Sequence, residues 1–402
     1  MSNKYDIAIV GGGIVGLLTS LALSKSGYKI IHIEKNELEI QNDNRSLAVS
    51  YSSIAFLNTL GLWSKVSDKT QAIQDVHISD KGKCGRAQIS SSDENLPFLG
   101  AIAPMQELLK MALDAVTEDD NITKSFATTV VGLTKVGQSQ SLTVKHTDSA
   151  DESMIGADLI IACDGVNSGI RKMLDVGAKT TDYKQDAIVF DIQTELAHNN
   201  TAFERFMSDG VLAVLPKTEN TMGCVWTVDR CDSKAQLDVS DSDFERSIQE
   251  RFGYRLGQIK IISKPALFPL YLVQSDKMYQ DNVLFFGNAL HFLHPVSGQG
   301  LNLSIRDIGC LYDLLAGNEL KQGYLSSKLD DFNNTRKSDH DRTIAVTHGF
   351  VKWFVSEDAK NVISRNIGLH LLQRSKFAKK ELSRVMMGKL SKGSTLMRKV
   401  VE

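Results

Sequence analysis

The first 34 residues allow few folds. Tyr5–Val10 is a continuous apolar run, residues 11–16 form a glycine-rich turn, and residues 15–26 place apolar side chains at helical spacing. A second apolar run, Lys29–Glu34, follows at once. A strand, a short crossover helix and a second strand predict a parallel β-α-β unit. We therefore expect an α/β protein built on a Rossmann-like sheet.

The turn between these strands has the spacing Gly11-x-Gly13-x-x-Gly16. In this context Gly11 permits the tight turn, Gly13 lets the backbone approach a pyrophosphate, and Gly16 lets helix and strand pack closely. Glu34 ends the second strand, where a carboxylate can accept hydrogen bonds from ribose hydroxyls and disfavours a 2′-phosphate. The motif predicts a site for an adenosine diphosphate group, not one for NADP.

Residues 283–302 repeat this pattern late in the chain: an apolar strand, a turn, then a helix over Leu301–Leu315. Backbone N–H groups at such a helix start can face an anionic edge of a reduced flavin ring. Asn288 lies within reach of a ribityl hydroxyl. Two such loops favour FAD over NAD, with an ordinary capped α/β turn as the alternative. No catalytic side chain stands out, so the flavin itself and one loop are the candidates: Pro295, Gly298, Gln299 and Gly300.

Composition excludes several classes of protein. A formal net charge of −2 argues against nucleic acid as a partner, because no basic excess neutralises phosphates. The five cysteines form no CxxC pair, which suits a reducing compartment. No apolar stretch approaches the ~20 residues of a membrane span. We expect a cytoplasmic protein.

The basic residues gather near the C-terminus. Residues 361–402 hold ten Lys or Arg and two acids, with apolar residues at helical spacing between them. Such a segment can lie on an anionic membrane, at its inner face, or dock on a partner protein. A solvated helical face is the equally weighted alternative.

Strand-like runs near 5–10, 29–34, 158–162 and 283–286 predict one dinucleotide-binding sheet, and a more antiparallel set lies between 181 and 270. The sheet is thus interrupted in sequence by a second, β-rich unit. The predicted units are a discontinuous FAD-binding domain (1–75, 100–180 and 272–325), a β-rich substrate domain (76–99 and 181–271) and a helical C-terminal region (326–402).

Three motifs now resemble one family. The N-terminal glycines with Glu34, then C-D-G-x-x-S-x-x-R (163–171), then G-N-A-x-H-x-x-x-P-x-x-G-Q-G-L-N (287–302), resemble the fingerprints of single-component flavin aromatic hydroxylases, in their usual order. The third motif is most similar to the ubiquinone-biosynthesis hydroxylases, especially those acting on octaprenyl methoxyphenols. The family usually has Gly-Asp where this chain has Gly287-Asn288. The amide keeps hydrogen bonding but loses a charge, which affects FAD affinity.

The resemblance implies a p-hydroxybenzoate-hydroxylase-like fold and an FAD-dependent monooxygenase. It implies that one oxygen of O₂ enters a prenylated phenol of ubiquinone biosynthesis, by way of a flavin C4a-hydroperoxide. NAD(P)H would be a transient donor, and accessory proteins of the pathway would be partners. A prenyl reductase, a halogenase or a flavin-binding scaffold remain alternatives, although the Trp-x-Trp of halogenases is missing. The further cofactor-binding residues implied are Arg45, Gln106, Asp164, Gly165, Arg171, Gly287, Leu301 and Asn302.

Two other groups of side chains each allow a functional and a purely structural interpretation. His291 and His294 could suggest a metal, but no third ligand is near in sequence, so a structural role is favoured and no metal is predicted. Several aromatic residues of the β-rich unit could line an apolar substrate pocket, although aromatics in sheets are more often core: Phe190, Phe203, Phe206, Trp226 and Tyr271.

Overall fold

The computed structural model describes residues 3–37, 45–136, 139–295, 298–355, 359–388 and 393–398. Its first elements are β1 (Asn3–Val10), α1 (Ile14–Ser24) and β2 (Ile30–Ile33). β1 pairs with β2 in parallel, so the predicted β-α-β unit is confirmed.

The first sheet has the strand order β18-β19-β11-β1-β2-β8. The four predicted strands all lie in it, and β1, β2, β11 and β19 run parallel. Sequence periodicity missed β8 and the antiparallel hairpin of β9 and β10, which extends β11. The bounds are β8 (Ile122–Ser125), β9 (Thr128–Val136), β10 (Ser139–His146), β11 (Glu152–Ala162), β18 (Tyr279–Gln280) and β19 (Val283–Phe285).

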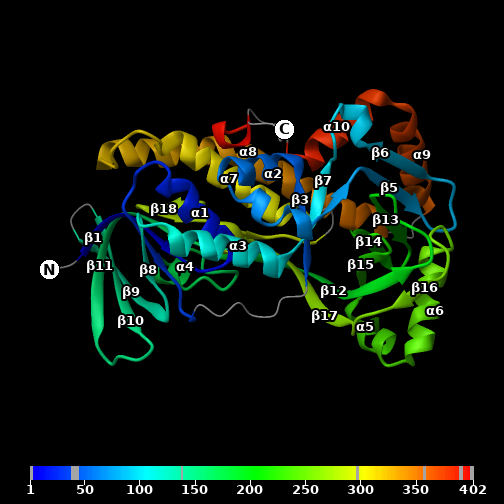
Figure 1. Ribbon diagram of the computed structural model, residues 1–402, viewed down its shortest axis with the longest axis horizontal. Helices are drawn as coiled ribbons and strands as arrows, with labels where there is room; N and C mark the ends of the chain where they lie inside the picture. The colour runs from blue at the N-terminus through cyan, green and yellow to red at the C-terminus, as the bar shows by residue number, and fades with distance from the viewer. Residues whose placement is uncertain are drawn as a thin grey trace.

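Helices cover one face of this sheet (Figure 1). α1 packs between α3 (Met105–Glu118) and α7 (Gln299–Leu315), and α7 packs against the long α8 (Gln322–Val355). Apolar side chains of the helices and of β1 form the largest buried core, with Ile7 and Ile9 fully buried in it. The opposite face is covered by β10 and the short α4 (Gly169–Met173).

The second sheet has the order β20-β17-β12-β15-β14-β13-β5-β6, with β16 beside β12. Its pairs are antiparallel except for β13 with β5, so the antiparallel set predicted between 181 and 270 is confirmed. The bounds are β5 (Asp75–Asp80), β6 (Arg86–Ser90), β12 (Ala178–Thr194), β13 (Thr201–Met207), β14 (Gly210–Thr218), β15 (Thr221–Asp229), β16 (Ile259–Ile261), β17 (Ala266–Ser275) and β20 (His291–Phe292).

Smaller elements join the two sheets. β3 (Ser46–Ser50), β4 (Gln71–Ile73) and β7 (Gly100–Pro104) form a short sheet beside α2 (Tyr51–Thr59). α5 (Arg230–Leu237) and α6 (Asp241–Phe252) pack on the second sheet. Since β12 and β17 reach from the first sheet into the second, they tie both parts together (Figure 1). The division into domains by residue range stays a prediction.

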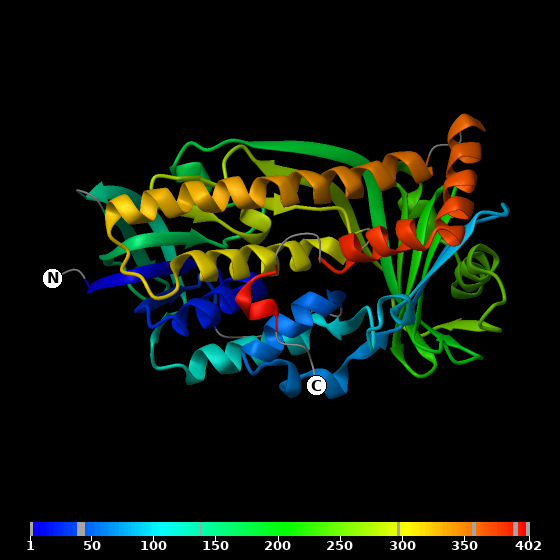
Figure 2. The same ribbon diagram turned by 90° about the horizontal axis from the view of Figure 1, so that it is seen from above.

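The C-terminal part is helical, as its sequence predicts. The next helices are α9 (Ala359–Arg374) and α10 (Lys376–Met386), which lie at the end of the molecule that carries β5 and β6 (Figure 2). The buried ion pair of Arg365 with Asp80 of β5, 2.8 Å between Nε and Oδ2, fixes α9 there. Within the described ranges, none of the helices has an apolar stretch long enough to cross a bilayer.

His32 on β2 makes the stability of the first sheet depend on pH. Its side chain is fully buried, with Nδ1 2.7 Å from Ser20 Oγ, and burial lowers its pKa to about 4. The unfolded chain takes up a proton near pH 6.5 and the folded chain does not, so the stabilisation is present above that pH and is lost as the pH falls toward 4. Urea unfolding at a series of pH values should show a loss of about 1.4 kcal/mol per pH unit from this residue.

His32→Leu should remove that part of the slope. His146→Gln, at an exposed histidine on β10, should leave it unchanged. An unaltered slope in the His32 variant would contradict the assignment.

Candidate functional site

Four parallel strands of the first sheet, β1, β2, β11 and β19, end at one edge, and a predicted site residue follows each of them. Val10 lies opposite Ile33 and Ala162, and Ala162 lies opposite Phe285. The chain then continues into the glycine turn, Glu34, the 163–165 loop and the 287–288 turn. Ligands of open α/β sheets bind at this carboxyl edge. The strand register therefore brings together motifs that are far apart in sequence.

A cavity of about 1630 Å³ lies along this edge and extends to the second sheet. Typical sites for small ligands measure roughly 300–1,000 Å³, so this one has room for a long cofactor and a second molecule. Most of the predicted site residues line it: Gly11, Gly13, Glu34, Arg45, Gln106, Asp164, Gly165, Asn288, Pro295, Gly298, Gln299, Gly300 and Leu301.

The glycine-rich turn is shaped by two contacts and one open space. A Cβ on Gly11, whose φ is +119°, would lie 2.3 Å from the carbonyl oxygen of Cys163. A Cβ on Gly16 would lie 2.0 Å from the carbonyl oxygen of Gly11. Gly13, by contrast, caps the N-terminus of α1 and has no atom within 4 Å of its Cβ position. The turn therefore leaves its free side toward the cavity, at the helix end that favours an anion.

Glu34 closes this turn from the neighbouring strand. Its carboxylate accepts hydrogen bonds from the backbone N–H groups of Gly12 and Asn36, the latter at 2.9 Å. The acid thus holds the turn in place as well as lining the cavity.

Replacing Glu34 with alanine should lower the affinity for FAD about ten- to hundredfold, because a charged acceptor contributes about 1.5–3 kcal/mol. Titration of the cofactor-free protein with FAD, followed by flavin fluorescence, measures the change. Glu118→Ala, at an exposed acid on α3, is the matched control and should bind FAD as the unchanged protein does. Equal affinity in both variants would refute the role of Glu34.

The late loop, which comprises the described residues 287–295 and 298, presents the start of α7 to the cavity. Gly287–Ala289 is a 3₁₀ turn, and Gly298, with φ +58°, is the N-cap of α7. A Cβ on Gly298 would lie 2.9 Å from Cβ of Ala48, so the loop packs tightly on β3. α7 begins at Gln299, two residues before the predicted start. The first backbone N–H groups of α7 form the positive end of a long helix dipole. They therefore face a ligand bound in the cavity.

The 163–171 loop has a braced side and an open side. Arg171 is buried and donates to the carbonyl oxygens of Ala289 (2.7 Å) and Val166 (2.9 Å), linking this loop to the late loop. Asp164 Oδ2 accepts from the N–H of Ile170, while its buried Oδ1 has no partner among the described residues. An acceptor left without a donor beside the glycine turn fits a polar cofactor group such as a hydroxyl of FAD.

Four predicted residues do not line the cavity. Gly16, Arg171 and Gly287 hold elements together, the last against Val15. Asn302 is buried, and its side chain donates to the carbonyl oxygens of Ala48 and Gly298, each at 2.8 Å, while accepting from Ser50 and Ser53. The side chain of Asn302 therefore positions the late loop.

The second sheet supplies an apolar wall that sequence reasoning found only in part. Of the aromatic candidates, Phe190 borders the cavity, but its ring is buried in the core against Phe244, with 5.2 Å between centroids. Phe203, Phe206 and Trp226 are core residues, and Tyr271 stacks on Arg230 at 5.1 Å. Strand alternation alone cannot say which face of a sheet meets a cavity. The lining side chains that were missed include Val76, Val189, Val211, Leu215, Phe268 and Phe292.

Arg45 and Gln106 enter the cavity between the two sheets. The guanidinium of Arg45 lies 5.9 Å from the ring centroid of Phe268, so it stands beside the apolar wall.

A buried cluster behind the late loop contains the predicted His291. Its ring lies edge-on to His340, with 4.8 Å between centroids, and His340 Nε2 lies 2.8 Å from Asp307 Oδ1. Arg336 Nε also donates to Asp307, at 2.7 Å. The two histidines and Asp307 offer ligand atoms within 4.8 Å of one another, a grouping that chain folding creates from β20, α7 and α8. A guanidinium on the carboxylate opposes a cation, so the geometry favours a structural role.

The charges in this cluster explain its acid–base behaviour. Burial by itself raises the pKa of Asp307, but the neighbouring His340 and Arg336 outweigh it and hold that pKa below its ordinary value. Burial, together with His340, lowers the pKa of His291 to about 3. Asp307 is thus ionised and His291 neutral at physiological pH.

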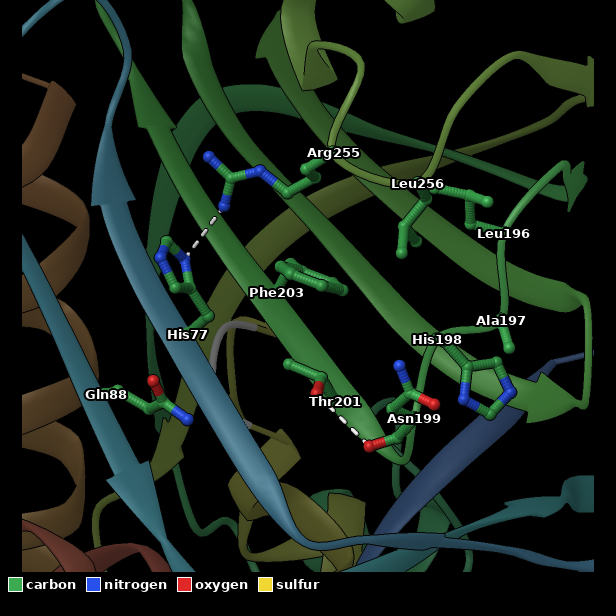
Figure 3. Close-up of a pocket in the computed structure, with 10 residues that line it drawn as sticks. All are labelled: His77, Gln88, Leu196, Ala197, His198, Asn199, Thr201, Phe203, Arg255 and Leu256. Atoms are coloured by element: carbon green, nitrogen blue, oxygen red, sulfur yellow. Dashed lines mark hydrogen bonds between the residues drawn. The ribbon is translucent and has the colours of Figure 1, made fainter.

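A smaller pocket of about 480 Å³ lies on the other face of the second sheet (Figure 3). Thr201 and Phe203 of β13 line it, whereas Ala202 and Glu204 line the large cavity. Arg255 approaches His77 there, with 3.0 Å between Nη1 and Nδ1. Because successive strand residues point to opposite faces, the sheet separates the two spaces.

Comparison with known proteins agrees with this geometry. The FAD binding domain family matches residues 4–344. Similar proteins include the ubiquinone hydroxylase UbiL of Rhodospirillum rubrum, 26% identical over 96% of this chain and 90% of that protein. Another is the 3-demethoxyubiquinol 3-hydroxylase of Escherichia coli, 27% identical over 78% of this chain and 81% of its own length.

Among solved structures, p-nitrophenol 4-monooxygenase PnpA of Pseudomonas putida DLL-E4 has the same fold. Its TM-score is 0.78 at 16% identity, covering 97% of this chain and all of that one. The predicted fold class is therefore confirmed. With its glycine turn, Glu34 and its late loop around one long cavity, the chain belongs to the FAD binding domain family, and its cofactor is FAD.

Proposed function

We propose that this protein is an FAD-dependent monooxygenase that hydroxylates the ring of a prenylated phenol in ubiquinone biosynthesis. The observation that carries the proposal is one cavity with two kinds of wall. Glycine turns, helix N-termini and Glu34 form one end, and apolar side chains of the second sheet form the other. The names of the relatives, ubiquinone hydroxylases, support the class of substrate.

Bound FAD, once reduced, supplies the activation of O₂. One oxygen atom enters the ring, the other leaves as water, and two electrons come from the donor. The protein's own residues position the substrate and shield the reaction from water. The first N–H groups of α7 would stabilise negative charge on bound flavin, and the walls formed by residues such as Val211 and Phe268 exclude water. No general base is assigned, because the phenol hydroxyl already activates the ring.

The cofactor assignments by residue are part of the proposal. Gly11, Gly13 and Glu34 would bind the adenosine diphosphate half, Asp164 and Gly165 the central part, and the late loop the flavin. The electron donor is NAD(P)H, docking transiently, because the dinucleotide fold is filled by FAD. The proposal also includes accessory proteins of the pathway as partners and a peripheral location of the protein at the inner face of the membrane.

Purification followed by a visible spectrum tests the first step, and flavin absorption bands are the expected result. NADH or NADPH oxidation with O₂ uptake, dependent on a prenylated phenol, then distinguishes a monooxygenase from a scaffold. A prenyl reductase would oxidise the donor without consuming O₂ or adding oxygen to the ring. Mass spectrometry should find one added oxygen that derives from ¹⁸O₂, and its absence would overturn the proposal.

Deleting the gene in its host supplies an independent test. A quinone precursor that lacks one ring hydroxyl should accumulate.

A further inference from the structure

Large apolar side chains stand exposed on the outer face of α9. Ile363, Ile367 and Leu371 follow one another at intervals of four residues, so they form one stripe along the helix. Their exposed fractions are 60%, 54% and 62%, and Phe377 at the start of α10 is 76% exposed. Arg365 and Leu369, on the opposite side of α9, are buried. The helix therefore already has a core face, and the stripe is a second apolar face.

Cations surround this stripe. α9 and α10 carry six Lys or Arg on their outer surface against one acid, Glu381, which pairs with Arg384 at 3.1 Å. The remaining chain must be net acidic, since the whole protein has a formal charge of −2. The six are Lys360, Arg374, Lys376, Lys379, Lys380 and Arg384.

The same helices reach the large cavity. Met386 at the end of α10 lines it, and its carbonyl oxygen accepts from Gln299 Nε2 of α7 at 3.2 Å. α9 packs on β5, whose Val76 also lines the cavity. α10 thus carries Phe377 near its start, and Met386 at its other end borders the cavity.

We infer that the stripe of Ile363, Ile367, Leu371 and Phe377, with its rim of cations, docks the protein on an anionic lipid bilayer. The apolar side chains enter the boundary between headgroups and acyl chains, and the cations face the lipid phosphates. A protein partner would not need this excess of one charge sign around an apolar stripe, whereas an anionic membrane complements both features. The inference that the protein docks on a membrane depends only on the composition of this surface. The further step, delivery of a membrane-borne phenol to the cavity, rests on the proposed function.

Vesicle sedimentation with the FAD-loaded protein tests the inference. The unchanged protein should bind vesicles of equimolar phosphatidylcholine and phosphatidylglycerol, and should bind pure phosphatidylcholine at least roughly tenfold more weakly. The double variant Ile367→Ser, Leu371→Ser should lose at least roughly tenfold in partition to the anionic vesicles. Lys376→Glu with Lys380→Glu should lose a similar factor and should remove most of the salt dependence.

The matched control is Val131→Ser with Val136→Ser, which removes two exposed apolar side chains from β9. This variant should bind as the unchanged protein does. Failure of the unchanged protein to bind anionic vesicles would overturn the inference and would leave a protein partner as the occupant. Equal binding by the Ile367/Leu371 variant would overturn it too.

An activity measurement separates this inference from the proposed function. The Ile367/Leu371 variant should hydroxylate a short-tailed phenol in solution at the unchanged rate, but a vesicle-borne prenylated phenol at least several times more slowly. Absence of turnover with both substrates would refute the proposed function and leave the vesicle result standing.

Discussion

Gly13→Ala is expected to fold normally and to lose FAD, with affinity reduced by roughly a hundredfold or more. The backbone at Gly13 is extended, with φ −69°, and nothing in the protein occupies the Cβ position, so the free protein tolerates a methyl group. The open side of the turn is where a pyrophosphate must come closest to the backbone. Flavin fluorescence titration measures affinity, and urea unfolding of the cofactor-free protein measures stability.

Gly16→Ala supplies the contrasting case on the same turn. Its methyl group would lie 2.0 Å from the carbonyl oxygen of Gly11, which is backbone and cannot move aside cheaply. We expect a loss of more than about 3 kcal/mol in the free energy of unfolding, with FAD lost as a consequence. Destabilised Gly13→Ala protein, or Gly16→Ala protein of unchanged stability, would contradict this division of roles.

Asp307→Asn should cost about 3–5 kcal/mol of stability, because it leaves buried charges without their partner. Asp307 accepts hydrogen bonds from both Arg336 and His340. Arg336 also forms an ion pair with Asp339, with 2.6 Å between Nη2 and Oδ2. Arg306 of α7 bonds the same Asp339 at 2.8 Å, so the cluster joins α7 to α8. Thermal or urea unfolding of the cofactor-free protein measures the loss.

Asp341→Asn is the control for that substitution. Asp341 lies on α8, the helix that carries Arg336 and His340, and its pair with Lys337 is exposed, so the change should stay within about 0.5 kcal/mol. A similar small effect at Asp307 would show that the cluster does not hold the two helices together.

The sequence predicts well the residues at the strand-edge end of the large cavity and predicts poorly those of its apolar wall on the second sheet, for a physical reason. Parallel strands end at one edge, so a motif that follows a strand is placed as soon as the strand is recognised, as with Gly11, Glu34, Asp164 and Asn288. The wall of the second sheet depends on which face of β12, β13 and β14 turns inward. Val189 and Phe190 are neighbours on β12, yet Val189 faces the cavity while the ring of Phe190 packs in the core against Phe244.

Contacts between distant segments were also beyond sequence reasoning. No periodicity indicates that His340 and Arg336 of α8 meet Asp307 of α7, or that Asn302 fastens the late loop to β3. The family resemblance implies that Arg171 binds the cofactor, and no local pattern reveals its bond to Ala289. The basic segment was recognised from charge, but its apolar stripe became visible only once Leu369 and Arg365 were seen to face inward.

The two spaces on either side of β13 limit how this chain can change over generations. A one-residue insertion or deletion within β13 would bring Thr201 and Phe203 to the large cavity and send Ala202 and Glu204 to the smaller pocket. Both linings would be exchanged by a single genetic event. Substrate preference should therefore diverge among relatives by point substitution along β13 and β14, while length variation is confined to turns such as the one between β14 and β15.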